Sequence, residues 1–432
     1  MKNLSLFLLL FITSLSASAQ TFKSDFGFSV NLSDDDWLAL NKQSASSSNK
    51  KASLQSLERL NIKSENAEKI LGRIADANVE FIFYKKNSDK TFNNNISIQR
   101  GAGSTARTQE QSDAACKTLE PELKKLYKEK ITITQCGMIK LDNYSFMSYE
   151  YSGAIAGVTT IQHEFQITPN LTFITIGGAK QDAAEKIRDT QMKVARAVIK
   201  HIKASPDYFK ISEAAVKALQ EKKYKTAFKQ LKILADAGDP EGLFNLAAFY
   251  EHGKTVKKDL KKAFKLYNQA AQQGHRHAIT KLGDFHLNGK ATKKNEDLAA
   301  RMFFQAGAMG DPVAQNSFAT MLFNGIGVKE KDPAKAIQWF AQSAQQGYPP
   351  AARNLIKIYE AEIESKNTKA YHPLAMIYLQ GAGVKQDTDK AMKMLEKAAF
   401  DGVAESRKAL HEIYSKGLFG IPKNEEKAKA WK

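Results

Sequence analysis

The side chains that could do chemistry are few, and their spacing suits none of the common reactions. No H-E-x-x-H motif, G-x-S-x-G elbow or phosphate-binding loop occurs, and no pair of cysteines has the spacing of a zinc site. His275 and His277 lie two apart at a predicted helix start and so point to different sides, and His286 is predicted to lie at a core edge. The carboxylates give no acid/base pair. We therefore predict no catalytic residue, no metal, no cofactor and no enzyme activity.

Two stretches invite a ligand-binding interpretation. Gly101-Ala-Gly103-Ser104-Thr105 is rich in glycine and follows a predicted strand, but it lacks the third glycine and the lysine of a nucleotide loop. A mobile hairpin or loop explains it better. Asp34-Asp35-Asp36, before Trp37, is either a cation site or the acidic start of a helix.

The only two cysteines, Cys116 and Cys136, both lie in the first half of the chain. If a helix over about 113–129 is followed by a strand over 131–137 that runs back along it, each cysteine lies roughly 20 Å from the turn. We therefore predict a disulfide, as suits an oxidising compartment. Two unpaired buried thiols remain the alternative.

The N-terminus predicts export. Lys2 precedes an apolar run over 4–15, and Ala17-Ser18-Ala19 forms an A-x-A cleavage site. We expect residues 1–19 to be a signal peptide cut before Gln20, rather than a membrane anchor, because the apolar run is too short to span a bilayer. No later run is long enough either. The sequence therefore predicts a periplasmic or secreted protein with no transmembrane segment after maturation.

The chain is basic, with 64 Lys and Arg against 46 Asp and Glu, and most of the excess follows residue 206. Only ten of these cations are Arg, the side chain favoured for specific phosphate recognition, and the lysines are scattered along helix faces. We therefore expect no nucleic-acid partner. A weak attraction to anionic envelope polymers stays open.

Residues 20–205 are predicted to form one α+β sandwich domain. Alternating or apolar runs predict strands, and amphipathic stretches predict helices near 51–77, 109–129 and 181–203. The last four strands, joined by short turns, should form an antiparallel meander. The predicted strands are Phe26–Leu32, Val79–Lys85, Asn95–Arg100, Ile131–Gln135, Tyr144–Tyr151, Thr159–Ile167 and Leu171–Ile176. The order of elements loosely resembles the PsbP-like fold.

Residues 206–432 consist of repeated helix pairs. The first helix of each unit carries a Leu, a small residue and an apolar-aromatic pair, followed by a glycine, as in Leu246-Ala247-Ala248-Phe249-Tyr250 with Gly253. The second helix ends at glycines 238, 274, 310 and 347, in steps of 36, 36 and 37. Such a period is typical of a solenoid in which neighbouring repeats share one core. We expect the glycines after the first helices to be left-handed C-caps.

These motifs resemble the Sel1-like repeat of the tetratricopeptide-like superfamily over about residues 208–432. The likeness is clearest in Gly325-Ile-Gly327-Val328 before Asp332-Pro-Ala-Lys-Ala336, and in Gly381-Ala-Gly383-Val384 before Asp387. The resemblance implies an all-α, right-handed solenoid whose concave face binds protein partners. The cysteine-rich subtype, which has a disulfide in each repeat, is excluded because no cysteine follows Cys136.

The repeat pattern is broken at two places. After Gly347 the next such glycine is Gly402, a step of 55, so one second helix should be missing and the superhelix should bend there. Residues 428–431 match the start of a second helix that then stops, and Trp431 is expected to cap the last core or to mark a contact surface.

The sequence thus predicts an exported adaptor of the bacterial cell envelope that binds protein partners through its helical repeats. The residues expected to face a partner occupy non-core positions of the first helices: Asn245, Lys281, Asp284, Ser317 and Thr320. One alternative is a small-molecule-binding or enzymatic N-terminal domain that the repeats merely dock. Another is a secreted effector with the same fold.

Overall fold

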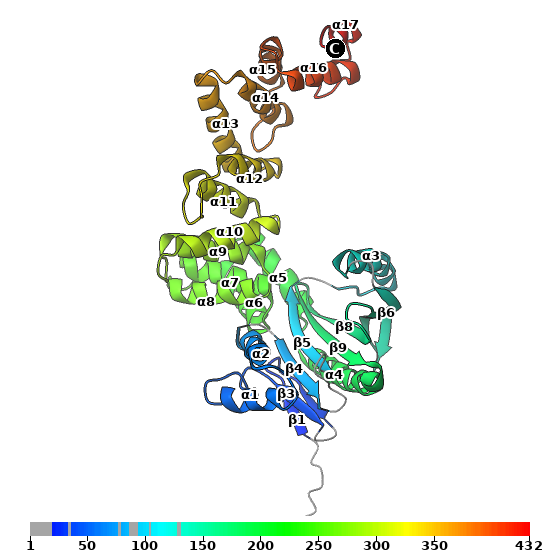
Figure 1. Ribbon diagram of the computed structural model, residues 1–432. Coiled ribbons are helices and arrows are strands. Elements are labelled where there is room, and N and C mark those ends of the chain that lie inside the picture. The colour runs from blue at the N-terminus through cyan, green and yellow to red at the C-terminus, as the bar shows by residue number, and fades with distance from the viewer. Residues whose placement is uncertain (1–19, 33–35, 77–78, 86–93, 103–104, 128–130) are drawn as a thin grey trace, which may run out of the picture. The chain divides into compact units, whose positions relative to one another are not determined.

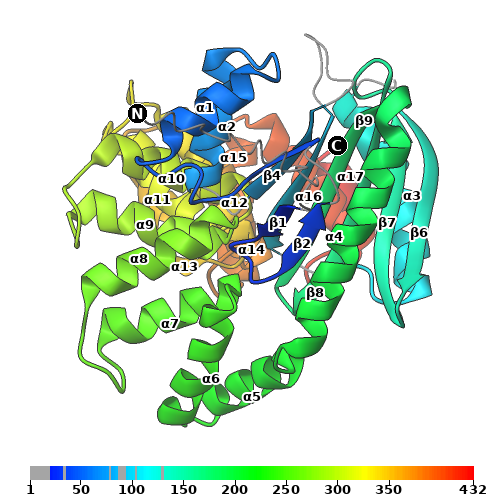
Figure 2. The same cartoon turned by 90° about the horizontal axis from the view of Figure 1, so that it is seen from below.

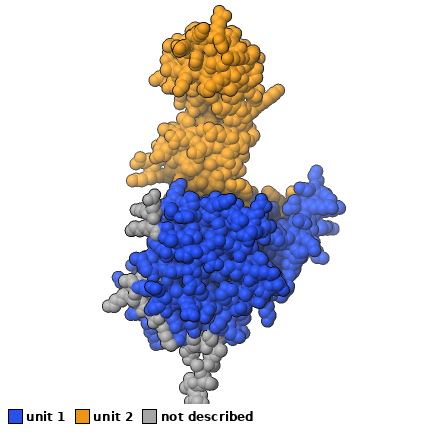
Figure 3. All heavy atoms as spheres, turned by 90° about the vertical axis from the view of Figure 1, so that its right-hand side faces the viewer, with its two compact units in different colours: residues 1–245 blue, residues 246–432 orange. Residues whose placement is uncertain are grey.

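The computed structural model describes residues 20–432 except 33–35, 77–78, 86–93, 103–104 and 128–130 (Figure 1). The predicted signal peptide, Asp34, Asp35, Gly103 and Ser104 lie outside the described residues. The chain falls into two compact units, residues 1–245 and 246–432 (Figure 3).

A seven-stranded antiparallel sheet is the centre of the first unit. Its strand order is β3-β4-β5-β9-β8-β7-β6, and β1 pairs with β2 in a separate two-stranded sheet. The predicted meander is confirmed, because β6, β7, β8 and β9 each pair with the next strand. The strands are β1 Gln20–Lys23, β2 Ser29–Leu32, β3 Trp37–Leu40, β4 Val79–Tyr84, β5 Asn95–Ala102, β6 Thr132–Leu141, β7 Tyr144–Ser152, β8 Val158–Thr168 and β9 Leu171–Lys180.

Helix α4, Ala184–Ala204, covers one face of this sheet (Figure 2). Its stripe of Ile187, Val194 and Val198 is buried against the strands, as its helical spacing predicts. The helix lies so close to β9 that a side chain at Gly177 would overlap that of Gln191. Gln191 bonds to the carbonyl of Ile161 on β8 at 3.0 Å, which ties the helix to the sheet.

The other face is only partly covered. Helix α2, Ser64–Asp76, packs its apolar side against Val79, Phe81 and Phe83 of β4. Helix α3, Gln109–Tyr127, packs on β6 at the opposite edge. The predicted disulfide is present and joins Cys116 of α3 to Cys136 of β6.

Two local predictions in this domain were wrong, and one open alternative is decided. The predicted helix over 51–77 is two helices, α1 Lys50–Glu58 and α2, separated by a turn in which Asn61 has a φ of 60°. Strands β1 and β3 were missed because each has only four residues. Of the two alternatives for Asp34-Asp35-Asp36, the helix start is wrong, since Trp37 opens β3.

Helix pairs make up the rest of the chain. They are α5 Tyr208–Gln220, α6 Tyr224–Asp236, α7 Pro240–His252, α8 Leu260–Gln272, α9 Arg276–Asn288, α10 Glu296–Ala308, α11 Pro312–Asn324, α12 Pro333–Gln345, α13 Pro349–Glu364, α14 Tyr371–Gln380, α15 Thr388–Phe400, α16 Ala404–Lys416 and α17 Glu425–Ala430. The predicted left-handed C-caps are confirmed at Gly289, Gly325, Gly381 and Gly417.

One joint recurs between the two helices of a repeat. In the second repeat, the backbone N–H of Asp259 donates to the carbonyl of Tyr250 at 2.9 Å, and the carboxylate of Asp259 caps α8 by accepting from the N–H of Lys262. The Lys262 ammonium then lies 4.2 Å from the Tyr250 ring centroid. Tyr378, Asp387 and Lys390 repeat this arrangement. The aromatic position of the motif is therefore part of the joint as well as of the core.

The predicted irregular repeat is also confirmed. Helix α13 leads through the 3₁₀ turn Thr368–Ala370 into α14 without a second helix between them. Leu355 of α13 and Ile377 of α14 belong to the same apolar cluster, so the core continues across the irregularity.

His163 is a buried histidine in the sheet core, 3 % exposed, between the rings of Phe146 and Phe165. Its Nδ1 has no hydrogen-bond partner among the described residues, and burial lowers its pKa to about 4. Because the folded domain disfavours the charged ring, stability is fully present above the unfolded pKa of about 6.5 and is lost as the pH falls towards 4.

We expect His163→Phe to remove this dependence. When the pH is lowered from 7.5 to 5, the free energy of unfolding of the wild type should fall by about 2 kcal/mol more than that of the variant. Buried Trp37 reports on this domain once Trp339 and Trp431 are replaced by Phe. A difference that stays constant over this range would contradict the assignment.

Candidate functional site

The five residues predicted to face a partner occupy two positions of the repeat. Asn245 on α7, Lys281 on α9 and Ser317 on α11 share one position, 36 residues apart. Asp284 and Thr320 share a second position three residues further on, so the two positions are neighbours on one helix face. All five side chains are partly exposed. The core position next to them stays apolar, as Leu246, Leu282 and Phe318.

Each of these five side chains is held by a contact within its own unit. The Asn245 amide donates to Glu241 at 2.7 Å, and Ser317 and Thr320 each donate to a carbonyl one turn earlier at 2.9 Å. Asp284 pairs with Lys290 at 2.8 Å. The polar surface of the first helices is therefore ordered in advance, which lowers the entropic cost of binding.

Lys281 belongs to a small charged network. Its ammonium lies 3.2 Å from Glu251, and the Tyr267 hydroxyl donates to the same carboxylate at 2.6 Å. Burial acts to raise the pKa of Glu251, but the Tyr267 hydrogen bond and the Lys281 charge outweigh it, and the pKa is lowered. Glu251 is thus held ionised beside Lys281.

An aromatic cluster that the sequence interpretation missed lies on the repeats. Phe304 of α10 is 51 % exposed, and its ring lies 5.4 Å from Phe318 and 5.9 Å from Trp339. The same position holds Asn268 one repeat earlier and Ala341 one repeat later. A phenylalanine at a position that is polar or small in the neighbouring repeats was the feature of the sequence that could have indicated this cluster. Exposed aromatic side chains backed by others are typical anchors of protein interfaces.

His372 and Ser406 resemble a catalytic pair, with Nδ1 and Oγ 2.9 Å apart. Ser406 is completely buried, so no substrate reaches its hydroxyl, and burial lowers the pKa of His372. The contact therefore joins α14 to α16. His286 lies at a core edge as predicted, with its ring against Phe264.

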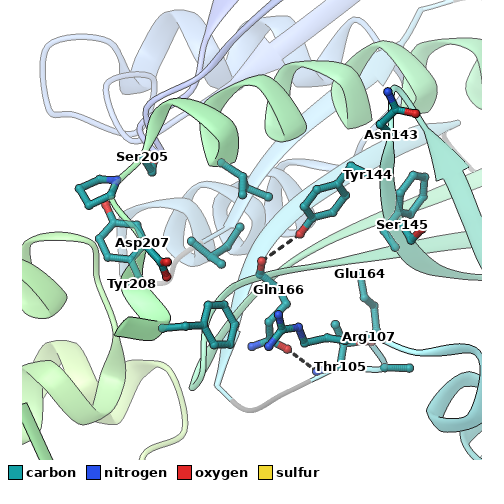
Figure 4. A pocket seen from close by; sticks show the side chains of 16 residues that line it. Thr105, Arg107, Asn143, Tyr144, Ser145, Glu164, Gln166, Ser205, Asp207 and Tyr208 are labelled. Atoms are coloured by element: carbon teal, nitrogen blue, oxygen red, sulfur yellow. Dashed lines mark hydrogen bonds between the residues drawn. The ribbon is translucent and has the colours of Figure 1, made fainter. Parts of the chain in front are cut away.

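A cleft of about 410 Å³ opens in the first unit (Figure 4). It is lined by residues 105–107, by the starts of β7 and α5, and by the end of β8. Tyr144 donates to the Gln166 carbonyl at 3.0 Å, and the Gln166 amide oxygen accepts from the N–H of Thr105 at 2.6 Å. Burial raises the pKa of Tyr144, and the nearby Arg107 charge partly opposes this.

One of the two carboxylates that line the cleft, Glu164, is surrounded by hydrogen-bond donors. Glu164 accepts hydrogen bonds from Thr105 at 2.5 Å, from Tyr149 at 3.0 Å and from Gln162 at 2.7 Å. Burial, followed by the Glu164 charge, raises the pKa of Tyr149, which keeps that hydroxyl a donor. The cleft is therefore equipped for binding more than for proton transfer.

The sheet and the second repeat, which begins at α7, are joined beside this cleft. Asp239, completely buried, caps α7 by accepting from the N–H of Gly242 at 2.7 Å. Its second oxygen accepts from the Thr168 hydroxyl and, at 3.4 Å, from the Asn170 amide, both in the β8–β9 turn. A side chain at Gly238, in the turn before α7, would overlap Arg100 of β5, so this strand also approaches the repeat closely.

Comparison with known proteins agrees with the helix pairs. The Sel1 repeat family matches residues 240–275, 276–311, 312–348, 368–399 and 408–431. A Sel1 repeat protein from Oxalobacter formigenes is 31 % identical over 48 % of this chain and 76 % of its own, with a TM-score of 0.29.

The chain belongs to the Sel1-repeat family.

Two other solved structures are similar to this Sel1-repeat protein. A protective antigen of uropathogenic Escherichia coli with an SLR fold is 24 % identical, covering 56 % of this chain and 55 % of its own, with a TM-score of 0.33. The PsbP of the cyanobacterium Synechocystis is 10 % identical, covering 42 % and 91 %, with a TM-score of 0.25. No curated protein matches the chain.

Sel1-repeat proteins are generally scaffolds for protein interaction. In the part of the chain that the structure describes, no helix is long and apolar enough to cross a membrane. No group of three side chains suited to a metal occurs among those residues either.

The junction at Asp239 gives a prediction. Thr168→Val removes one donor from a buried carboxylate, which should destabilise the start of α7 by about 1–3 kcal/mol. Amide hydrogen exchange at Gly242 should speed up accordingly, while Thr134→Val, at an exposed threonine of β6, should leave it unchanged. Equal exchange in both variants would show that the Thr168 bond carries no stability.

Proposed function

We propose that this Sel1-repeat protein is an exported adaptor of the bacterial cell envelope that binds a protein partner through its first helices. The observation that carries the proposal is the contrast between neighbouring repeat positions. The neighbouring core position stays apolar, whereas the partly exposed position beside it changes from Asn245 to Lys281 to Ser317. A recognition surface varies in this way over a constant scaffold.

The disulfide and the basic surface support the location. Disulfides persist in oxidising compartments such as the periplasm. The lysine excess on the repeats also suits a weak attraction to anionic envelope polymers, which would add to partner binding at low ionic strength.

Export makes a direct prediction about the mature chain. The protein purified from the envelope fraction of its own cells should begin at Gln20, as read by mass spectrometry of the intact chain. A protein that keeps residues 1–19, or that is found only in the cytoplasm, would contradict the proposed location.

The partner surface is tested with two matched variants in crosslinking pull-downs from the native envelope fraction. The first replaces the five proposed residues, Asn245, Lys281, Asp284, Ser317 and Thr320, with Ala. The second replaces exposed residues of the second helices, Lys265, Gln269, Asp297, Gln305 and Gln342, with Ala and has the same net charge. We expect the first variant to lose capture of the wild-type partner at least about tenfold, and the second to keep it.

Equal capture by all three proteins would remove the first helices as the binding surface. If only the second variant lost capture, the partner would contact the second helices, where Phe304 and Trp339 lie.

A further inference from the structure

Three cavities of the first unit share lining residues and so form one groove, which ends along α5. The cleft of about 410 Å³ shares Arg107, Gln166 and Phe209 with a second cavity of about 420 Å³, which reaches Gln111 and Ala115 of α3. The second cavity shares Pro169 and Phe209 with a third of about 730 Å³, which follows α5 as far as Glu221. The groove is therefore long and open, and it suits an extended chain better than a compact ligand.

Apolar groups recur along the groove. The Phe209 ring and Pro169 lie where the cavities meet, and Ala115 lines the middle cavity. Val216 of α5 is 52 % exposed and lines the third cavity, while its neighbours Ala215 and Ala218 are buried. An exposed valine in a concave wall gives an apolar side chain of a bound peptide a place to pack.

Two cations line the groove, Arg107 in the first two cavities and Lys217 of α5 in the third. The Arg107 guanidinium lies 4.0 Å from the centroid of the Phe209 ring and makes no ion pair with a described residue. Its planar edge can donate two parallel hydrogen bonds to a carboxylate.

The carboxylates near Arg107 are already engaged. Glu164 is held by three donors, and Asp207 caps α5 and pairs with Lys210 at 3.2 Å. Glu221, at the far end, pairs with Lys223 at 2.8 Å, and Glu213 also lies towards that end. The groove thus offers, at Arg107, a guanidinium that is unpaired among the described residues, whereas along α5 the charge of Lys217 is opposed by Glu213 and Glu221.

We propose that this groove binds an extended peptide segment of a protein partner, with an Asp or Glu side chain of the peptide at Arg107. Aliphatic or aromatic residues of the peptide pack on Phe209, Pro169 and Val216. None of the five residues proposed on α7, α9 and α11 lines this groove, so the two sites can be tested separately.

The test uses a displayed library of random twelve-residue peptides, selected against the full-length mature protein. The selection is repeated against Arg107→Gln and against Arg196→Gln, which removes an exposed arginine of α4 outside the groove. We expect the wild type and Arg196→Gln to enrich peptides with an Asp or Glu beside apolar residues, and Arg107→Gln to lose this preference.

The best peptide is then synthesised in two forms, one with the acidic residue and one with its amide. By fluorescence polarisation, the acidic form should bind the wild type at least about tenfold more tightly than the amide form, and this difference should vanish in Arg107→Gln. Val216→Ser should weaken both forms equally, which identifies the apolar wall.

Three results would overturn the proposal. They are a selection that enriches nothing, enriched peptides that bind Arg107→Gln as tightly as the wild type, and displacement of the peptide by free succinate at the peptide's own concentration. The last result would assign the site to a small carboxylate. Circular dichroism establishes that each variant is folded.

Discussion

The buried carboxylate of Asp239 is the interaction on which the first unit depends. A buried charge is costly unless donors surround it, and here the donors come from the first turn of α7 and from the β8–β9 turn of the sheet. Asp311, in the same position two repeats later, caps α11 and accepts from His277 and Thr280 of α9. At the start of α7, the β8–β9 turn therefore supplies the donors that α9 supplies at the start of α11.

The packing of a β-turn, and not a helix, against the start of α7 also explains the groove beside Phe209. When one helix pair stacks on another, complementary side chains fill the space between them. A β-turn carries fewer side chains, so Thr168 and Asn170 satisfy Asp239 while Pro169 leaves open space beside Phe209. The β-turn that stabilises the Asp239 carboxylate thus leaves the space beside it unfilled, and this space is the groove.

The sequence predicted those features that depend on short-range periodicity. Several strands alternate, as β5 does, and the repeat positions return every 36 or 37 residues, so both could be predicted directly. The disulfide followed from the distance of each cysteine from one turn. The groove could not be predicted, because Arg107, Gln166 and Phe209 are far apart in sequence and meet only through the register of the sheet and the Asp239 junction.

The irregular repeat shows how far the solenoid tolerates change. In the preceding repeat, Gly327 packs on the start of α10, a second helix, whereas its equivalent Gly383 packs on Tyr348 and Ala352 at the start of α13. Helix α13 has a first-helix sequence but takes over this contact, so the stack continues without the missing helix. The apolar core therefore continues although one second helix is missing. The alternation of first and second helices is interrupted at α13 and resumes at α14. Core residues and exposed residues occupy different positions of the repeat. The exposed residues can therefore change type while the core residues stay apolar.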